Sequence, residues 1–250
     1  MVEATILTRD GSPTRYHSRY QQHYHSLSGA HLEARMRYVV ASRVVEKARD
    51  QGKVRILDVG FGLGTNLAWA IHEIQQEVPG ASIEIISLER ELLPVDVLLP
   101  HFKALPETRL ARMLSGLVQT REWIESNLRL QLICAEAQKE IDSIEGPFDT
   151  VFLDPFSPRC NPELWASPFL AAIRRRMAQG GILTTYSCAR SVRLSLIQAG
   201  WEIGVGPRVG SKSSGTVASC GPVLPPLAAI DLKQSRWLDR QLRRPGDGES

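Results

Sequence analysis

From Lys53 onward, short apolar runs alternate with stretches whose apolar positions recur every three or four residues. Runs of the first kind are typical of buried strands, and stretches of the second kind are typical of amphipathic helices. The alternation predicts an α/β fold in which helices on both faces cover a mostly parallel sheet. Seven strands are expected, over Val54–Val59, Ile83–Leu88, Leu130–Cys134, Thr150–Leu153, Gly181–Tyr186, Trp201–Val205 and Thr216–Ser219.

The remaining pattern predicts the helices and the outer parts of the chain. Residues 9–28 are polar and rich in Tyr and His, and residues 29–49 have helical spacing after Ser28, a residue type that caps helices. We expect an N-terminal extension with a lid and a helix over 1–50, an α/β domain over 51–220 and a tail over 221–250. Further helices are expected over Thr65–Glu77, Gln138–Ile144, Pro162–Met177 and Ser191–Ala199, with a helical insertion over Leu92–Asn127.

The composition is that of an ordinary folded protein of 250 residues, with 43% hydrophobic and 23% charged residues. The formal charge of +3 argues against a protein that coats nucleic acid indiscriminately. However, 24 of the 30 basic residues are Arg, whose planar fork suits phosphate, and residues 170–212 hold seven basic residues against one acidic residue. The balance is therefore compatible with a docked anionic partner.

The four cysteines show no Cys-x-x-Cys pair or other metal-ligand spacing, so we expect reduced thiols and no metal site. No stretch of about 18 apolar residues and no signal-peptide pattern is found. These observations predict a cytoplasmic protein that does not associate with membranes.

A glycine loop follows the first expected strand, at the sheet edge where open α/β proteins bind their ligands. Its sequence is Gly60-Phe61-Gly62-Leu63-Gly64, and Thr65 stands where a dinucleotide fingerprint requires its third glycine or alanine. Such a loop suits an adenosine ligand without a pyrophosphate, as in S-adenosylmethionine. A tight strand-to-helix turn is the alternative interpretation.

Acidic residues near three strand ends strengthen the ligand interpretation. Glu89 ends the second strand, where an acid accepts hydrogen bonds from ribose hydroxyls. Glu136 follows the third strand and is a candidate partner of the adenine amino group. Asp58, near the end of the first strand, either braces the loop or accepts from the ligand.

The fourth expected strand ends in the most specific motif, Asp154-Pro155-Phe156. An acid followed by proline and an aromatic residue resembles the site of nucleobase amino-methyltransferases. There a carboxylate orients an amine and accepts its proton, and an aromatic ring stacks on the base. The structural alternative is that Asp154 braces a turn, that Phe156 and Trp165 belong to the core, and that Asn161 caps a helix.

These motifs resemble the methyltransferase domain of the MnmC family, called MnmD when it stands alone. The matching segments are GFGLGTN (60–66), SLER (87–90), LDPFSPRCNPELW (153–165), GGILTTYSCARSVRLSLIQAGW (180–201) and residues 10–35. The resemblance implies a class I S-adenosylmethionine-dependent, Rossmann-like domain that methylates 5-aminomethyl(-2-thio)uridine at the tRNA wobble position. It places Asp154 at the amine, and around the cofactor Gly60, Gly62, Gly64, Asn66, Glu89 and Glu136. From the glycine loop and its strand we also expect Asp58 and Phe61 among the cofactor contacts.

The resemblance also implies partners and excludes a second cofactor. Upstream wobble-uridine enzymes would act on the same tRNA, and no FAD is expected because the chain ends about thirty residues after its last strand. The candidate substrate contacts are Phe156, Trp165, Tyr186, Arg174, Arg190 and Lys212. The segment Tyr24-His25-Ser26 is a candidate lid, and the early histidines are interpreted as polar or packing residues.

Two other functions remain open at this point. Aminopropyltransferases of the spermidine-synthase type share the sheet and the glycine loop, although the Arg-rich later half does not suit a polycationic substrate. A non-catalytic module that binds the cofactor or tRNA is the other alternative, and the intact Asp154 motif argues against it.

Overall fold

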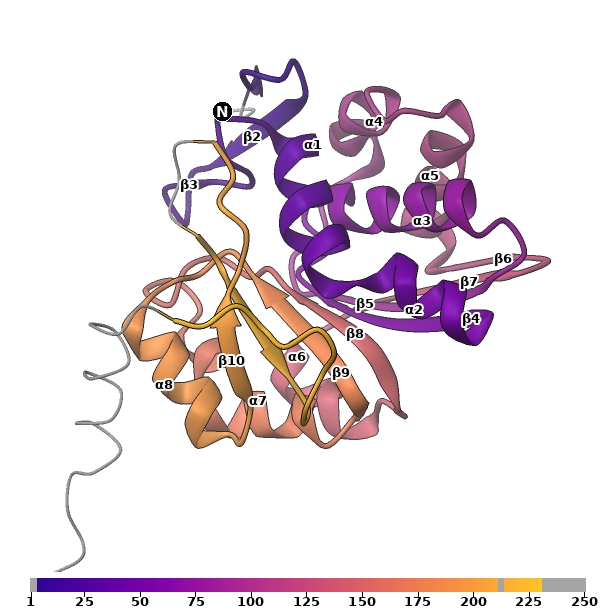
Figure 1. The fold of residues 1–250 in the computed structure, drawn as a ribbon. Coiled ribbons are helices and arrows are strands. Elements are labelled where there is room, and N and C mark those ends of the chain that lie inside the picture. Colours follow the sequence, from indigo (N-terminus) through magenta and orange to yellow (C-terminus); the bar gives the residue numbers. More distant parts are fainter. Residues whose placement is uncertain (1–3, 211–213, 231–250) are drawn as a thin grey trace, which may run out of the picture.

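The computed structural model describes residues 4–210 and 214–230, which form a large mixed sheet, a small N-terminal sheet and the helices around them (Figure 1). The large sheet has eight strands in the order β10-β11-β9-β8-β4-β5-β7-β6. Its five central strands run parallel, and the strands at both edges pair antiparallel. The strands are β4 (Lys53–Val59), β5 (Ser82–Glu89), β6 (Glu122–Glu125), β7 (Leu128–Cys134), β8 (Phe148–Leu153), β9 (Met177–Thr185), β10 (Glu202–Val205) and β11 (Thr216–Ser219).

All seven expected strands are present, but the expected count was wrong by one. The eighth strand, β6, lies within the Leu92–Asn127 insertion, which also contains helices α4 (Val95–Lys103) and α5 (Thr108–Thr120). Arg121 ends α5 with a left-handed φ of 69°, and the chain then turns back so that Trp123 pairs with Leu130 of β7. Four residues of alternating exposure are too short to be distinguished from helix by period alone.

Helices cover both faces of the large sheet, as the pattern predicts (Figure 1). One face carries the π-helix η1 (Ala34–Val40), α2 (Val44–Gln51), α3 (Thr65–Glu77), α4 and α5. The other face carries α6 (Ala137–Glu140), the 3-10 turns η2 (Ile141–Ser143) and η3 (Pro162–Trp165), α7 (Ser167–Arg174) and α8 (Arg190–Gln198). The helix expected over Pro162–Met177 is therefore divided between η3 and α7, and Met177 already begins β9.

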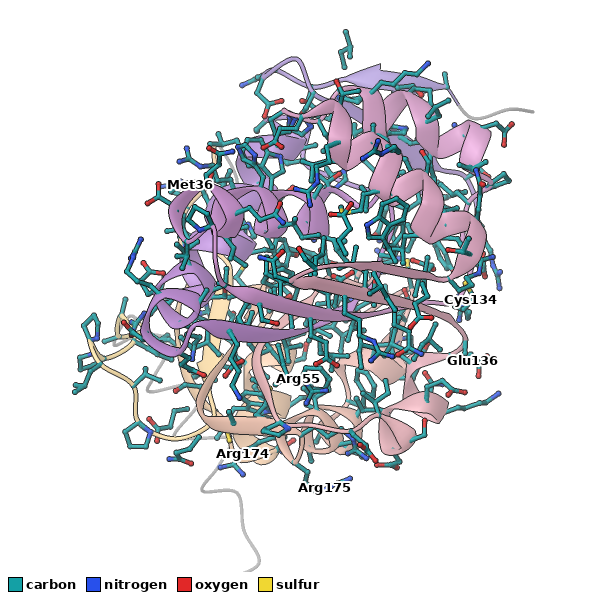
Figure 2. All side chains as sticks on the ribbon, turned by 90° about the vertical axis from the view of Figure 1, so that its right-hand side faces the viewer. Met36, Arg55, Cys134, Glu136, Arg174 and Arg175 are labelled. Atoms are coloured by element: carbon teal, nitrogen blue, oxygen red, sulfur yellow. The ribbon has the colours of Figure 1, made fainter. Side chains whose placement is uncertain are left out.

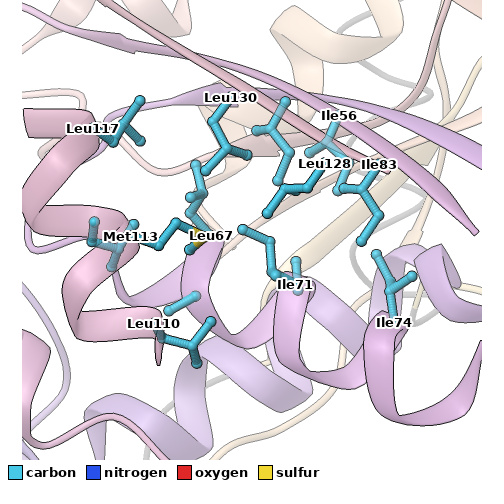
Figure 3. Close-up of a cluster of buried hydrophobic side chains, with 14 of the residues drawn as sticks. Ile56, Leu67, Ile71, Ile74, Ile83, Leu110, Met113, Leu117, Leu128 and Leu130 are labelled. Atoms are coloured by element: carbon cyan, nitrogen blue, oxygen red, sulfur yellow. The ribbon is translucent and has the colours of Figure 1, made fainter. Parts of the chain in front are cut away.

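Strands β4, β5 and β8 are buried on both faces, which explains their nearly continuous apolar sequences, whereas β7 alternates between buried and exposed residues. In β4, Ile56 belongs to the cluster beneath α3 and α5, whereas its neighbour Leu57 belongs to the cluster beneath α7. Figure 3 shows the first cluster, where side chains of the sheet meet those of α3 and α5. Its labelled members are Ile56, Leu67, Ile71, Ile74, Ile83, Leu110, Met113, Leu117, Leu128 and Leu130.

The N-terminal extension differs from the single polar segment and helix that the sequence predicts. Strands β1 (Thr5–Leu7), β2 (Pro13–His17) and β3 (Gln22–His23) form a three-stranded antiparallel sheet. The helical part comprises α1 (Ala30–Glu33), η1 and α2, and it is interrupted at Arg43, which has a φ of 57°.

Ser28 is not the N-cap of α1. Gly29 occupies the N-cap position, and glycine has no side chain that could accept a hydrogen bond from the first N–H groups of the helix. The Ser12 hydroxyl instead accepts from the backbone N–H of Ala30 at 2.9 Å, and Asp10 accepts from that of Leu32 at 3.1 Å. The connection between β1 and β2 thus supplies the caps that the helix would otherwise lack.

The described part of the tail, residues 221–230, runs as an irregular segment past β10, where the N–H of Val205 donates to the carbonyl of Ala228 at 2.8 Å. The short amphipathic piece expected around 235–242 lies outside the described residues. No helix in the described ranges has the length and apolar character needed to cross a membrane.

Candidate active site

A cavity of about 550 Å³ lies at the carboxyl edge of the parallel strands. Residues that follow β4, β5, β7, β8 and β9 line one side of it, and residues 17–28 of the N-terminal extension line the other. Its volume is in the range of small-molecule and cofactor sites. The parallel topology produces this convergence, since the ends of all five strands meet at one edge.

The glycine loop forms the floor of the cavity. Gly60 has a φ of 100°, and a side chain there would place its Cβ 2.8 Å from the carbonyl oxygen of Asp154. Gly62 has a φ of 52°, and its N–H donates to Glu89 Oε2 at 3.0 Å. A non-glycine residue would be strained at either position, and at Gly62 its Cβ would also lie 3.2 Å from the Tyr24 ring. The loop therefore needs glycine for the close approach of its backbone to Asp154 and to Tyr24.

Phe61 and Gly64 face away from the cavity. Phe61 is buried in the cluster beneath α3, and Gly64 is the N-cap of α3, packed against Phe102 and Leu114. Neither residue lines the cavity. They shape the loop from behind, and we do not include them among the proposed cofactor contacts.

Asp58 lies beneath the loop and is almost fully buried. Its Oδ2 accepts a hydrogen bond of 2.5 Å from the Ser87 hydroxyl, which lies opposite it on β5. Burial raises the pKa of Asp58 to about 8, and the nearby charges of Asp154 and Glu89 act in the same direction. The side chain does not line the cavity, so of its two expected roles the position favours bracing the loop.

Two of the predicted cofactor acids lie on the cavity wall. Glu89 Oε1 accepts from the N–H of Glu91 at 2.9 Å while its other oxygen holds Gly62, so the carboxylate is fixed by two backbone donors. Glu136 is partly exposed and pairs with Lys139 at 2.6 Å, and this hydrogen bond lowers its pKa. Figure 2 shows Glu136 just beyond Cys134, the last residue of β7.

Asp154 lies beside Gly60 and is held by two side chains from other parts of the chain. The Tyr38 hydroxyl donates to its Oδ1, and the Asn66 amide donates to its Oδ2 at 2.7 Å. Burial, followed by the charge of Asp154, raises the pKa of Tyr38 well above its usual value, so the phenol stays protonated and remains a donor. Asn66, expected at the cofactor, is instead bonded to the candidate catalytic carboxylate.

Four aromatic rings of the cavity lining meet where the N-terminal extension contacts the loop after β8, and we call them the aromatic wall. Phe156 lies 4.5 Å from Tyr20 and 5.2 Å from both His17 and Tyr24, measured between ring centroids. The last three come from the segment that forms β2, β3 and their connections. Flat aromatic surfaces of this kind suit a nucleobase, which presents a π-face irrespective of its identity.

Trp165 and Tyr186 both brace the Asp154 loop through the backbone. The indole of Trp165 donates to the Phe156 carbonyl at 2.9 Å, and the Tyr186 hydroxyl donates to the Pro155 carbonyl at 3.0 Å. Tyr186 also lines the cavity, whereas Trp165 is buried and does not. Of these two candidate substrate contacts, only Tyr186 is placed to meet a ligand.

The candidate basic contacts are divided between the two edges of the sheet. Arg174 ends α7, and the backbone of Arg176 two residues later accepts a hydrogen bond of 2.7 Å from Phe148, the first residue of β8. This is the amino edge, and Figure 2 shows Arg174 well apart from Glu136. Arg190 is exposed at the start of α8, just after Tyr186. Lys212 lies outside the described residues.

Several residues in and behind the cavity wall are not among the candidates that the sequence predicts. Arg90 directly follows Glu89, and its guanidinium donates to the Tyr20 hydroxyl. The Tyr- and His-rich composition of residues 9–28 was a signal for the aromatic wall, but it did not identify which rings meet Phe156. Tyr38 gave no signal, because an aromatic residue at a helical position is usually core. Within the described ranges, no three or more His, Cys, Asp or Glu side chains are arranged to hold a metal ion.

Comparisons with known proteins agree with this geometry. A family model described as S-adenosyl-L-methionine-dependent methyltransferase matches residues 100–220. The crystal structure of MnmC2 from Aquifex aeolicus is 36% identical, with a TM-score of 0.83, over 95% of this chain and 75% of that one.

The curated relatives are longer than this chain. The bifunctional protein MnmC of Acidovorax sp. (strain JS42), named for tRNA 5-methylaminomethyl-2-thiouridine biosynthesis, is 29% identical over 91% of this chain and 37% of its own length. The MnmC protein of Pseudomonas fluorescens (strain Pf0-1) is 30% identical over 78% of this chain and 31% of its own length. The chain thus spans about a third of their length. From the identity and coverage shared with the Aquifex structure, the chain belongs to the MnmC-type family of S-adenosyl-L-methionine-dependent methyltransferases.

Proposed function

We propose that this protein methylates the aminomethyl nitrogen of 5-aminomethyl(-2-thio)uridine at the wobble position of tRNA. The observation that carries the proposal is the Asp154 carboxylate, which two side-chain donors orient beside the glycine loop in the same cavity as the aromatic wall. The names of the MnmC relatives support this substrate.

The proposed cofactor half of the cavity comprises Gly60, Gly62, Glu89 and Glu136. Gly60 and Gly62 present no side chains of their own to the cavity, the Tyr24 ring lies beside Gly62, and the fixed carboxylate of Glu89 is an acceptor. These groups suit an adenosine with a ribose diol. S-adenosyl-L-methionine supplies a methyl group on a sulfonium, whose carbon–sulfur bond breaks as a nucleophile attacks. Asp58 supports the loop from below and keeps Ser87 in place.

The proposed substrate half comprises Asp154, Phe156 and Tyr186. Phe156 stacks on the uracil ring, and Asp154 orients the amine so that its lone pair points at the methyl carbon. As the nitrogen–carbon bond forms, the nitrogen becomes a secondary ammonium, and Asp154 accepts the proton that it loses. Methylaminomethyluridine and S-adenosylhomocysteine are the products.

The N-terminal extension is proposed to act as a lid, because Tyr24, His25 and Ser26 line the cavity and the ring of Tyr24 lies next to Gly62 of the glycine loop. Arg190 and the exposed Arg9, which lines the cavity, are proposed to contact the tRNA backbone. The enzymes that install the aminomethyl group must act earlier on the same tRNA, and a tRNA substrate would place this protein in the cytoplasm.

The experiment is methyl transfer to tRNA that carries the aminomethyl group, with labelled cofactor and nucleoside analysis of the product. Wild-type protein is expected to label one nucleoside. Asp154→Ala should lower kcat by a factor on the order of 10² to 10⁴, the usual contribution of a proton acceptor, with cofactor affinity retained. Tight cofactor binding without any labelled nucleoside would refute the proposed substrate.

The two other functions are not favoured by family membership. Product analysis with putrescine and decarboxylated cofactor would detect an aminopropyltransferase. Calorimetric titration without S-adenosylmethionine binding would be the signature of a module that lacks catalysis.

A further inference from the structure

The N-terminal extension reaches the candidate catalytic carboxylate through one side chain. Tyr38 lies on η1, and its hydroxyl donates a hydrogen bond to Oδ1 of Asp154, which is 116 residues later in the sequence. Its ring also packs edge-on against Phe152 of β8, with centroids 5.7 Å apart. The extension therefore binds the candidate catalytic carboxylate from behind the cavity wall, in addition to lining the cavity with other residues.

Two consecutive residues of the π-helix η1 bind two different strand ends. Arg37 and Tyr38 are consecutive, and both are fully buried. Arg37 donates to the carbonyl of Tyr186 at 3.1 Å while Tyr38 donates to Asp154, so adjacent residues bind the ends of two different strand loops. Short π-helical segments are rare and are frequently found at functional sites.

We infer that Tyr38 and Asn66 are positioning residues that hold the Asp154 carboxylate in the orientation required for methyl transfer. This inference rests on the proposed function, because it assigns the two residues a role in that same reaction. Each donates to a different oxygen of the carboxylate, so together they fix both its position and its rotation.

Tyr38 and Asn66 have a different role from Asp154 within the site. Tyr38 is buried and protonated, so it does not exchange protons with a substrate and acts only as a donor. Asn66 is also buried, and its Nδ2 must face Asp154, because a flipped amide would place two acceptors against each other. Both residues therefore act through Asp154, and neither is expected to change cofactor affinity.

The test is a double-mutant cycle with Tyr38→Phe, Asn66→Leu and Asp154→Ala. Tyr38→Phe keeps the ring against Phe152 and removes only the hydroxyl, so kcat should fall on the order of tenfold, the value of one hydrogen bond to a charged group. Asn66→Leu should do the same. The KM for tRNA and the calorimetric Kd for S-adenosylmethionine should stay at the wild-type values.

The decisive comparison adds each substitution to the Asp154→Ala variant. In that variant, Tyr38→Phe and Asn66→Leu should cause no further loss of kcat, because the carboxylate through which they act is absent. Losses that add in this background, or a single variant with wild-type kcat, would overturn the inference. Loss of cofactor affinity in Asn66→Leu would show that Asn66 contacts the cofactor and would overturn its positioning role.

Two controls separate this inference from folding and from the proposed function. Tyr16→Phe makes the same chemical change at an exposed residue outside the cavity and should keep wild-type kcat. Thermal unfolding of each variant shows whether it is folded at the assay temperature. A wild-type protein without activity on aminomethyl tRNA refutes the proposed function, whereas active wild type with an equally active Tyr38→Phe refutes only the positioning role.

Discussion

At the scale of one residue, the sequence motif identifies Asp154 but not the side chains that bind it. The acid, the proline and the aromatic residue that follow β8 identify it as the candidate catalytic group. Its two donors, Tyr38 and Asn66, lie 116 and 88 residues away in the sequence. No local pattern connects them to Asp154, because the contact exists only when the helices bearing them pack against the same strand end.

Asp58 leads to a prediction about pH and stability. Burial raises its pKa to about 8 from the ordinary value of 3.8, so the folded protein binds a proton that the unfolded chain releases. This proton stabilises the fold fully below the unfolded pKa, and its contribution is lost as pH rises through the folded pKa. The loss amounts to about 1.4 kcal/mol per pH unit at most.

Comparison with Asp58→Asn measures this effect, because the amide does not titrate. Between pH 4 and 8, the free energy of unfolding of the wild type should fall relative to that of the variant, as followed by urea denaturation. Parallel pH profiles would show that Asp58 is ionised in the folded protein throughout this range.

At the scale of elements, the strands were more predictable than the helical extension. The seven expected strands are present: β4, β5 and β8 are buried on both faces and keep nearly continuous apolar runs, and β7 shows the alternation of a strand with one buried face. The expectation that Ser28 caps α1 is wrong because the capping groups, Asp10 and Ser12, come from the connection between β1 and β2. Caps supplied from elsewhere in the chain leave no mark at the helix start.

The glycine loop gives a prediction at this scale. Gly60→Ala would combine a positive φ with a Cβ 2.8 Å from the Asp154 carbonyl, so the loop and the end of β8 must separate. We expect loss of cofactor binding and a decrease of about 1 to 3 kcal/mol in the free energy of unfolding.

Gly80→Ala is the matched control. Its added Cβ would meet no atom within 4 Å, and its φ is not in the left-handed region. Cofactor affinity, measured by calorimetry, should be unchanged in Gly80→Ala and lost in Gly60→Ala. Equal affinity in the two variants would contradict a role of the loop in binding.

At the scale of the whole molecule, the basic later half of the sequence does not form one surface. Arg175 and Arg176 pair with Asp142 at the amino edge of the sheet, and Arg193 is buried against Thr216. Arg190 lies near the opposite edge, close to the strand end that carries Tyr186. Strand β9 runs along the sheet between Arg176 and Arg190, so these residues lie at opposite edges although they are close in sequence.

This division predicts which arginines affect tRNA binding. Arg9 is exposed at the cavity, so Arg9→Ala should raise the KM for tRNA and reduce the slope of log affinity against log salt by about one phosphate contact. Arg175→Ala, at the amino edge, should change neither quantity. The measurement is tRNA binding over a salt series, and equal effects of the two variants would show that tRNA docks without regard to the cavity.

The order of apolar runs and helical stretches was sufficient to predict a parallel sheet with its ligand site at one edge. Strand burial follows from local periodicity, and parallel strand direction follows from the helical stretch between successive strands. The glycine loop and the Asp154 motif were visible for the same reason, since each occupies consecutive residues at a strand end. The aromatic wall, the Tyr38 and Asn66 hydrogen bonds and the separation of the arginines follow from how distant segments pack. Such contacts depend on the crossing of helices and the path of the N-terminal sheet, which no pattern of neighbouring residues encodes.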